Sequence, residues 1–228
     1  MINGKSILAV IPARGGSKRL PKKNTLPLRG KPLIGWTIKA ALESQYIDKI
    51  IISSDDLEVK KISSLYNVDF IDRPKDLSLD DSTTISVVMH AFEQLDAKYN
   101  YLILLQPTSP LRNYIDIDNA ISLLEKKQSD AIISVCEVGH PPLFTNTIPS
   151  DGSMVNFINP EMQNKRTQDL PQFYKINGAI YICCINRLIK EKTFFIKDNV
   201  FSYVMSKEKS IDIDDEFDFK LAQYLLDS

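Results

Sequence analysis

Apolar and polar residues alternate along the first two thirds of the chain with two different periods. Short runs that are apolar at nearly every position predict parallel strands buried on both faces. Longer segments with apolar residues three or four positions apart predict amphipathic helices. The predicted strands are 6–12, 48–54, 68–72, 101–106 and 130–138, and the predicted helices are 31–45, 55–67, 85–95 and 115–127.

This alternation implies an α/β fold with a doubly wound, mostly parallel sheet, which binds ligands at the carboxyl ends of its strands. We expect residues 1–228 to form this one domain. After Glu137 the rhythm stops, and residues 139–176 are rich in Pro, Asn and Asp; strand-like runs return at 177–185 and 192–206, and a last helix is predicted at 216–228. Because so long an irregular stretch is rare in a compact domain, we expect residues 139–205 to include an arm that contacts substrate or a second subunit.

Composition narrows the functional class. The 28 Lys and Arg residues nearly balance the 29 Asp and Glu residues, which argues against a nucleic-acid-binding protein. No apolar run approaches the length of a membrane span. Cys136, Cys183 and Cys184 have neither a C-x-x-C spacing nor a histidine placed to share a metal. We therefore expect reduced cysteines in the core of a cytoplasmic protein.

A basic loop, "IPARGGSKRLPKKN" at 11–24, follows the first predicted strand. Seven basic residues and no acidic one occur from Arg14 to Lys31. Gly15 and Gly16 let backbone amides turn inward, Ser17 adds a hydroxyl donor, and the loop's cations suit phosphate oxygens; those cations are Arg14, Lys18 and Lys23. The loop matches neither the Walker A motif nor G-x-G-x-x-G, and the alternative is a solvated run of charge.

An acidic segment lies near the other end of the chain, with five acids and no base between Ser210 and Asp218. In "SIDID" the isoleucines alternate with Asp212 and Asp214, so a strand would place both carboxylates on one face. Two carboxylates suit Mg²⁺, which completes its octahedron with water and phosphate oxygens. The alternative is a helix start, with Asp214 as the N-cap.

Gln106 stands just beyond a predicted strand, in "LLQPTSPLR" at 104–112. Its amide can donate and accept hydrogen bonds, as the hydroxyls and substituents of a sugar require. Ser109 and Arg112 are candidates only for ordering this loop.

The basic loop, "LLQPTSPLR", "NGAIYI" at 177–182 and "SIDIDDEFD" at 210–218 resemble, in the same order, the motifs of the CMP-sialic acid synthetases (acylneuraminate cytidylyltransferases). The resemblance runs from about residue 7 to residue 225. It implies a Rossmann-like nucleotidyltransferase fold and a reaction in which the anomeric hydroxyl of a nonulosonic acid attacks the α-phosphate of CTP. The products are a CMP-sugar and pyrophosphate. The implied cofactor is Mg²⁺ on Asp212 and Asp214, which with Lys23 form the catalytic set.

By the same resemblance, CTP is bound by the basic loop and by later residues. Asn24 would lie near the nucleotide, Arg73 would donate to the cytosine O2, and Thr84 would supply a hydroxyl. The alternative for Arg73 is an exposed turn arginine. The implied CTP-binding set is Arg14, Gly15, Ser17, Lys18, Lys23, Asn24, Arg73 and Thr84.

The acidic nine-carbon sugar is assigned to Gln106 and to residues of the irregular region and the following strand. Arg166 and Lys175 are candidate cations for the sugar carboxylate, with Tyr181 nearby. Phe194 and Phe195 resemble an aromatic pair that dimeric members insert into the partner's active site; the alternative is core packing. A homodimer is therefore expected, with no nucleic-acid or membrane partner.

Two positions depart from the sialic-acid-specific pattern. Lys175 stands where an arginine is typical, and Phe144 stands where a lysine is common. Lysine lacks the two-pronged grip of arginine, and Phe144 makes that corner less polar. Both changes favour a less hydroxylated sugar such as legionaminic acid. The alternatives are another acidic sugar such as KDO, or a metal-dependent glycosyltransferase that uses a D-x-D pair.

Overall fold

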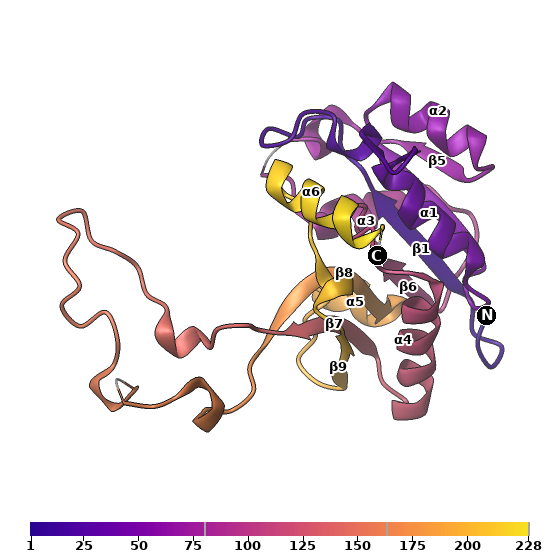
Figure 1. Ribbon diagram of the computed structural model, residues 1–228. Coiled ribbons are helices and arrows are strands. Elements are labelled where there is room, and N and C mark those ends of the chain that lie inside the picture. The colour runs from indigo at the N-terminus through magenta and orange to yellow at the C-terminus, as the bar shows by residue number, and fades with distance from the viewer. Residues whose placement is uncertain (80, 163, 228) are drawn as a thin grey trace.

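A seven-stranded mixed sheet forms the centre of the protein in this computed structural model (Figure 1), which describes residues 1–79, 81–162 and 164–227. Its strand order is β5-β4-β1-β6-β8-β7-β9. β5, β4, β1 and β6 are mutually parallel, β8 is antiparallel to both its neighbours, and β7 is parallel to β9. The α/β fold is confirmed. The strands are β1 (Ile7–Pro12), β4 (Lys49–Ser54), β5 (Asp69–Asp72), β6 (Tyr101–Leu104), β7 (Ala131–Glu137), β8 (Tyr174–Cys184) and β9 (Val200–Met205).

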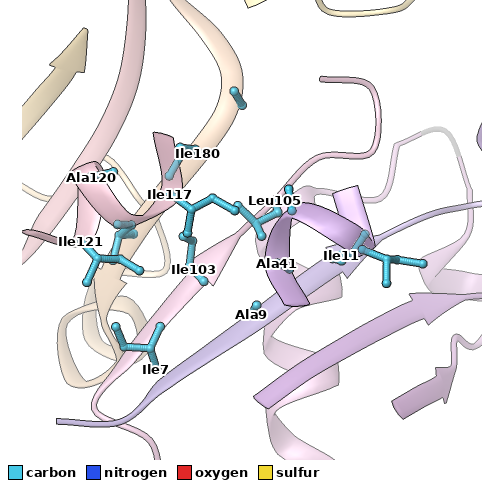
Figure 2. Packing of buried hydrophobic residues seen from close by; sticks show 14 of the residues in the cluster. Ile7, Ala9, Ile11, Ala41, Ile103, Leu105, Ile117, Ala120, Ile121 and Ile180 are labelled. Carbon is cyan, nitrogen blue, oxygen red and sulfur yellow. The ribbon is translucent and has the colours of Figure 1, made fainter. Parts of the chain in front are cut away.

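Helices cover both faces of the sheet, because alternate residues of each central strand point to opposite sides. From β1, Ile7, Ala9 and Ile11 pack with residues of α1, α2 and α4, as Figure 2 shows in part. Leu8 and Val10 pack on the other face with residues of α3 and α5. The helices are α1 (Leu33–Glu43), α2 (Leu57–Leu65), α3 (Thr84–Glu93), α4 (Tyr114–Lys127), α5 (Ile185–Glu191) and α6 (Glu216–Leu225).

Two short elements link the ends of the chain. β2 (Pro27–Leu28) and β3 (Lys31–Pro32) form a small hairpin after the basic loop. Leu28 and Leu33 pack in one cluster with Ile213 and Ala222, so α6 lies beside the basic loop (Figure 1). This packing brings the basic loop and the acidic segment, about 190 residues apart in the chain, to one end of the sheet.

The chain between β7 and β8 leaves the body of the protein as a long arm (Figure 1). In its described part the arm holds three single 3-10 turns, at Pro142–Phe144, Pro160–Met162 and Thr167–Asp169. The irregular region was predicted, but β8 begins at Tyr174 and so inside it.

Three sequence-based expectations need correction. Residues 185–191 form α5, whereas no helix was predicted there. Strand structure in 192–206 is confined to β9, and the preceding residues bend around the end of α5. Residues 211–214 are extended but pair with no strand.

The three cysteines are free thiols, and Cys136 and Cys183 are buried. Cys183 packs on the α5 side of the sheet and Cys184 against the opposite cluster, as their neighbouring positions in a strand predicted. Burial raises the pKa of the Cys183 thiol to about 12, so it serves packing. None of the helices in the described ranges has the length and apolarity needed to cross a bilayer.

Candidate active site

A cleft of about 600 Å³ opens at the carboxyl ends of β1, β5 and β6. Ten of the residues predicted from the sequence line it, and they come from the basic loop, the turn after β5, the first turn of α3, the loop after β6 and the acidic segment. These ten are Arg14, Ser17, Lys18, Lys23, Asn24, Arg73, Thr84, Gln106, Asp212 and Asp214. Lys18 and Asp212, near opposite ends of the chain, therefore face the same space.

Hydrogen bonds to the end of β4 and to the residue that follows it fix the start of the basic loop. Ala13 N donates to the carbonyl of Ser53 (2.9 Å), and Gly15 N donates to Asp55 Oδ1 (2.9 Å). The buried Asn24 closes the loop from the other side, because its Nδ2 donates to the Arg14 carbonyl (3.0 Å). These bonds fix the backbone of the basic loop from Ala13 to Asn24, and the cations Arg14, Lys18 and Lys23 face the cleft.

Gly15, which the sequence assigns to CTP binding, does not line the cleft in this structure, where its amide donates to Asp55 Oδ1. A Cβ at this position would approach the Asp56 Cβ to 3.2 Å. The absence of a side chain therefore serves close packing of the loop against the start of α2.

The acidic segment meets the basic loop directly. Lys23 Nζ donates to the Ile213 carbonyl (2.6 Å) and to Asp214 Oδ1 (3.3 Å), and Arg19 NH2 lies 3.1 Å from Asp214 Oδ2. Ile213 is fully buried, so its neighbours Asp212 and Asp214 point toward the cleft. The alternation predicted for a strand is thus present in an unpaired extended segment.

The helix that follows begins one residue later than the capping alternative assumed. Asp215, and not Asp214, is the N-cap of α6, and it forms a capping box with Asp218. Asp214 is therefore not needed as a cap, and its carboxylate is available to the cleft cations.

The floor of the cleft is narrow between Asp212 and Gln106. Gly178 separates them at a φ of +76°, and a Cβ there would lie 2.8 Å from Gln106 Oε1 and 3.5 Å from Asp212 Oδ2. Ile213 N donates to the Thr108 carbonyl (2.8 Å), which ties the acidic segment to the loop after β6. Only glycine fits this position without strain, because it combines a left-handed backbone with a close approach.

The surroundings of Asp212 change the pKa values of two groups near the floor of the cleft, Asp212 itself and Tyr181. Partial burial raises the pKa of Asp212, although its carboxylate is open to the cleft; the neighbouring Asp214 adds to the rise, whereas the Thr108 side chain and Lys23 oppose it. Burial, and then the charge of Asp212, raise the pKa of Tyr181. A cation bound between the carboxylates would relieve this repulsion.

Arg73 is buried and held, which excludes the exposed-turn alternative. Its NH2 donates to the Ser53 carbonyl (2.5 Å) and its Nε to Ser53 Oγ (3.3 Å). Burial lowers the pKa of its guanidinium to about 10, opposed by Asp55. A buried guanidinium on the wall of a cleft is suited to recognising a polar base edge.

The residues predicted to bind the sugar do not all lie at the cleft of their own chain. Gln106 lines the cleft, and Tyr181 lies close enough to Asp212 for their charges to interact, but neither Arg166 nor Lys175 lines the cleft of its own chain. Phe194 is buried in the core with its ring 5.6 Å from that of Tyr181, so the packing alternative describes it. Phe195 is 55% exposed and meets Tyr181 edge-on at 6.3 Å.

Several site residues were missed by sequence reasoning. Arg19 and Thr108 line the cleft. Both lie inside matched motifs, but the sequence does not show that Arg19 pairs with Asp214 or that the Thr108 carbonyl accepts from Ile213 N. Gly178 lies in the matched motif "NGAIYI", but nothing in the sequence indicates its left-handed φ or its close approach to Gln106.

The donor set fits a hard divalent cation. Asp212 and Asp214 offer carboxylate oxygens to one cleft, and Mg²⁺ takes few protein ligands. In the described part of the chain no group of three or more His, Cys, Asp or Glu side chains is arranged for a metal. A cation here would therefore complete its shell with water and phosphate oxygens.

A cleft at the carboxyl ends of parallel strands, with cations on one wall and paired carboxylates on the other, is typical of α/β enzymes that act on nucleoside triphosphates. Sequence comparison agrees and is more specific. The chain belongs to the cytidylyltransferase family, whose model matches residues 8–208.

Individual relatives share most of the chain. It is 37% identical to the CMP-N,N'-diacetyllegionaminic acid synthase of Legionella pneumophila, over 97% of this chain and 96% of that protein. It is 36% identical to the N-acylneuraminate cytidylyltransferase of Escherichia coli O18:K1:H7, over 95% of this chain and 51% of that protein. The fold is similar to that of a CMP:2-keto-3-deoxy-manno-octonic acid synthetase complexed with CTP (TM-score 0.70, 16% identity, 97% and 98% of the two chains).

Proposed function

We propose that this enzyme transfers CMP from CTP to the anomeric hydroxyl of a nonulosonic acid. The observation that carries the proposal is the contact of Lys23 with Asp214 and the Ile213 carbonyl, because it brings the two charged motifs to one cleft. The relatives in the family, which are named for CMP-legionaminic acid synthesis and for N-acylneuraminate cytidylyl transfer, support this reaction.

In the proposed reaction the anomeric oxygen forms a bond to the α-phosphorus. The bond from that phosphorus to the oxygen bridging to the β-phosphate breaks, pyrophosphate leaves with the electron pair, and the proton of the anomeric hydroxyl passes to solvent water. Arg14, Lys18 and Lys23 stabilise the negative charge that develops on the leaving group. Ser17 donates to a phosphate oxygen, while Asn24, Arg73 and Thr84 bind the nucleoside.

Asp212 and Asp214 would hold Mg²⁺, which neutralises the triphosphate and lowers the pKa of a coordinated hydroxyl. Lys23 and Arg19 hold Asp214 in the free enzyme. When a triphosphate arrives these cations gain phosphate partners, and Asp214 becomes available as a ligand. In this proposal, Lys23 and Arg19 exchange Asp214 for phosphate oxygens, and Asp214 exchanges these two side chains for the cation.

Gln106 orients the sugar from the floor of the cleft. Arg166 and Lys175 lie on the arm and at the start of β8, outside the cleft of their own chain. They reach a sugar only if the arm of one subunit contacts the cleft of another. We therefore include a homodimer, and a cytoplasmic location, in the proposal.

We propose legionaminic acid as the preferred sugar class. Lys175 and Phe144 offer fewer donors than the arginine and lysine typical of sialic-acid-specific enzymes. The identity to a CMP-N,N'-diacetyllegionaminic acid synthase over nearly both full lengths supports this choice.

The test is pyrophosphate release from CTP with a panel of N,N'-diacetyllegionaminic acid, N-acetylneuraminic acid and KDO. We expect release with the legionaminic acid at a kcat/KM at least equal to that with N-acetylneuraminic acid. A strong preference for N-acetylneuraminic acid would refute the choice of sugar. Absence of release with every acid would refute the cytidylyl transfer itself.

A further inference from the structure

A buried polar network lies directly behind the floor of the cleft. Asn177 is 3% exposed, on β8 next to Gly178. Its Oδ1 accepts from Ser134 Oγ (2.6 Å) and Ala179 N (3.2 Å), and its Nδ2 donates to Ser210 Oγ (2.9 Å) and Met205 Sδ (3.3 Å). Every hydrogen-bonding atom of this amide is therefore used inside the protein, so Asn177 does not bind substrate.

The network joins the sheet to the acidic segment. Ser134 belongs to β7, and its Oγ also accepts from Ile180 N (2.8 Å). Ser210 is the last residue before the extended segment, and its Oγ donates to the Ser206 carbonyl (2.7 Å). Asn177 is thus the link between a central strand and the residue two positions before Asp212.

Two anchors hold the short chain that carries Asp212. Ser210 is fixed to Asn177 on one side, and Ile213 N is fixed to the Thr108 carbonyl on the other. The same strand places Gly178 against both Gln106 Oε1 and Asp212 Oδ2. The carboxylate therefore has little freedom to move as long as both anchors hold.

We propose that Asn177 is a positioning residue, which through Ser210 sets the place of the Asp212 carboxylate for a divalent cation. The proposal rests on the proposed function, in which Asp212 and Asp214 are the cation ligands. Groups that hold ligands in place affect metal affinity strongly without touching the metal. The effect should appear in the cation requirement and, at saturating Mg²⁺, not in the KM for CTP, whose proposed contacts come from the basic loop, Arg73 and Thr84.

The test compares two variants of buried serines. Ser210→Ala removes the link from Asn177 to the acidic segment, whereas Ser63→Ala removes a comparably buried hydroxyl that donates to the Lys60 carbonyl (2.7 Å) within α2, outside the network of Asn177. Two quantities are measured in each: the Mg²⁺ concentration that gives half-maximal rate, and the affinity for Mn²⁺ of the enzyme saturated with CTP in the absence of sugar, by electron paramagnetic resonance. Urea unfolding corrects for lost stability.

We expect Ser210→Ala to raise both cation constants about tenfold while the KM for CTP stays within about twofold. Ser63→Ala should leave the cation constants near those of the wild type, and Ser210→Thr, which keeps the hydroxyl, should restore them. Equal cation constants in Ser210→Ala and Ser63→Ala would overturn the positioning role. A wild-type enzyme that needs no divalent cation and binds no Mn²⁺ would instead overturn the metal assignment in the proposed function.

Discussion

Replacing Gly178 by alanine tests the geometry at the floor of the cleft. The residue has a φ of +76°, which costs a non-glycine residue about 1–2 kcal/mol. The new methyl group would also start 2.8 Å from Gln106 Oε1, a distance that side chains essentially never tolerate. The Gln106 amide must therefore move, because the neighbouring carboxylate of Asp212, at 3.5 Å, leaves the methyl little room on the other side.

Gly30→Ala is the matched control. Gly30 has a φ of +77° in the β2–β3 turn, and a Cβ there meets nothing within 4 Å. The two variants share the backbone strain and differ in the clash at the cleft. We expect both to lose about 1–2 kcal/mol of unfolding free energy in urea.

The two variants, Gly178→Ala and Gly30→Ala, should differ in kcat/KM for the sugar. A shift of about 1 Å in a substrate-positioning group can reduce a rate 100-fold. We therefore expect Gly178→Ala to lower kcat/KM for the sugar about 10- to 100-fold, which is about 1.4–2.7 kcal/mol of transition-state stabilisation. Gly30→Ala should keep wild-type kinetics in the pyrophosphate assay. If Gly178→Ala turned over sugar as fast as Gly30→Ala, the assignment of Gln106 to the sugar would be wrong.

Two further substitutions test the charged groups. Asp214→Asn should reduce turnover roughly 100- to 1000-fold, because one electrostatic group is lost, and should lower the urea midpoint modestly, because Lys23 loses its ion-pair partner while the Asp215 cap remains; near-normal turnover measured by pyrophosphate release would contradict its catalytic role. Arg112→Met should lower the unfolding free energy by about 2 kcal/mol, because the buried guanidinium donates to the Ala179 carbonyl (3.1 Å) and to Thr37 Oγ1 (2.8 Å); unchanged stability in urea would show that the cost of burying the charge cancels those bonds.

Local sequence signals predicted much of the fold, and they failed where pairing is non-local. α1, α2, α3 and α4 and the parallel strands follow from periodicity, because a single apolar face or run fixes each of them. The antiparallel insertion of β8 between β6 and β7 depends on partners 37 to 83 residues away, from the pair Glu137 and Tyr174 to the pair Tyr101 and Cys184. No local pattern specifies such a pairing.

The same distinction between local sequence signals and non-local structure applies to the candidate site. Charge patterning indicated the cations of the basic loop, because a one-sign cluster is unusual on a mixed surface, whereas the pair Asp212 and Asp214 was chosen from the alternation in "SIDID" and from the family resemblance. These signals could not indicate that Gly15 packs closely against the start of α2, or that Phe194 is buried and Phe195 exposed. Those outcomes depend on how the chain bends after α5 and where α2 begins, which only the assembled structure fixes.

The contact between Lys23 and Asp214 explains why the two charged motifs can coexist in a free enzyme. A loop of uncompensated cations would repel itself, and adjacent carboxylates would do the same. Facing each other across 3.3 Å, they neutralise one another, and the Lys23 side chain remains only 12% exposed. In the proposed reaction, a metal-bound triphosphate would offer phosphate oxygens to Lys23 and a cation to Asp214, so substrate binding would exchange one set of charge contacts for another and keep the mostly buried Lys23 paired. A nucleotide without its cation would pair with Lys23 and Arg19 but leave Asp214 without a partner, so under that proposal we expect the metal–nucleotide complex to bind more tightly than the nucleotide alone.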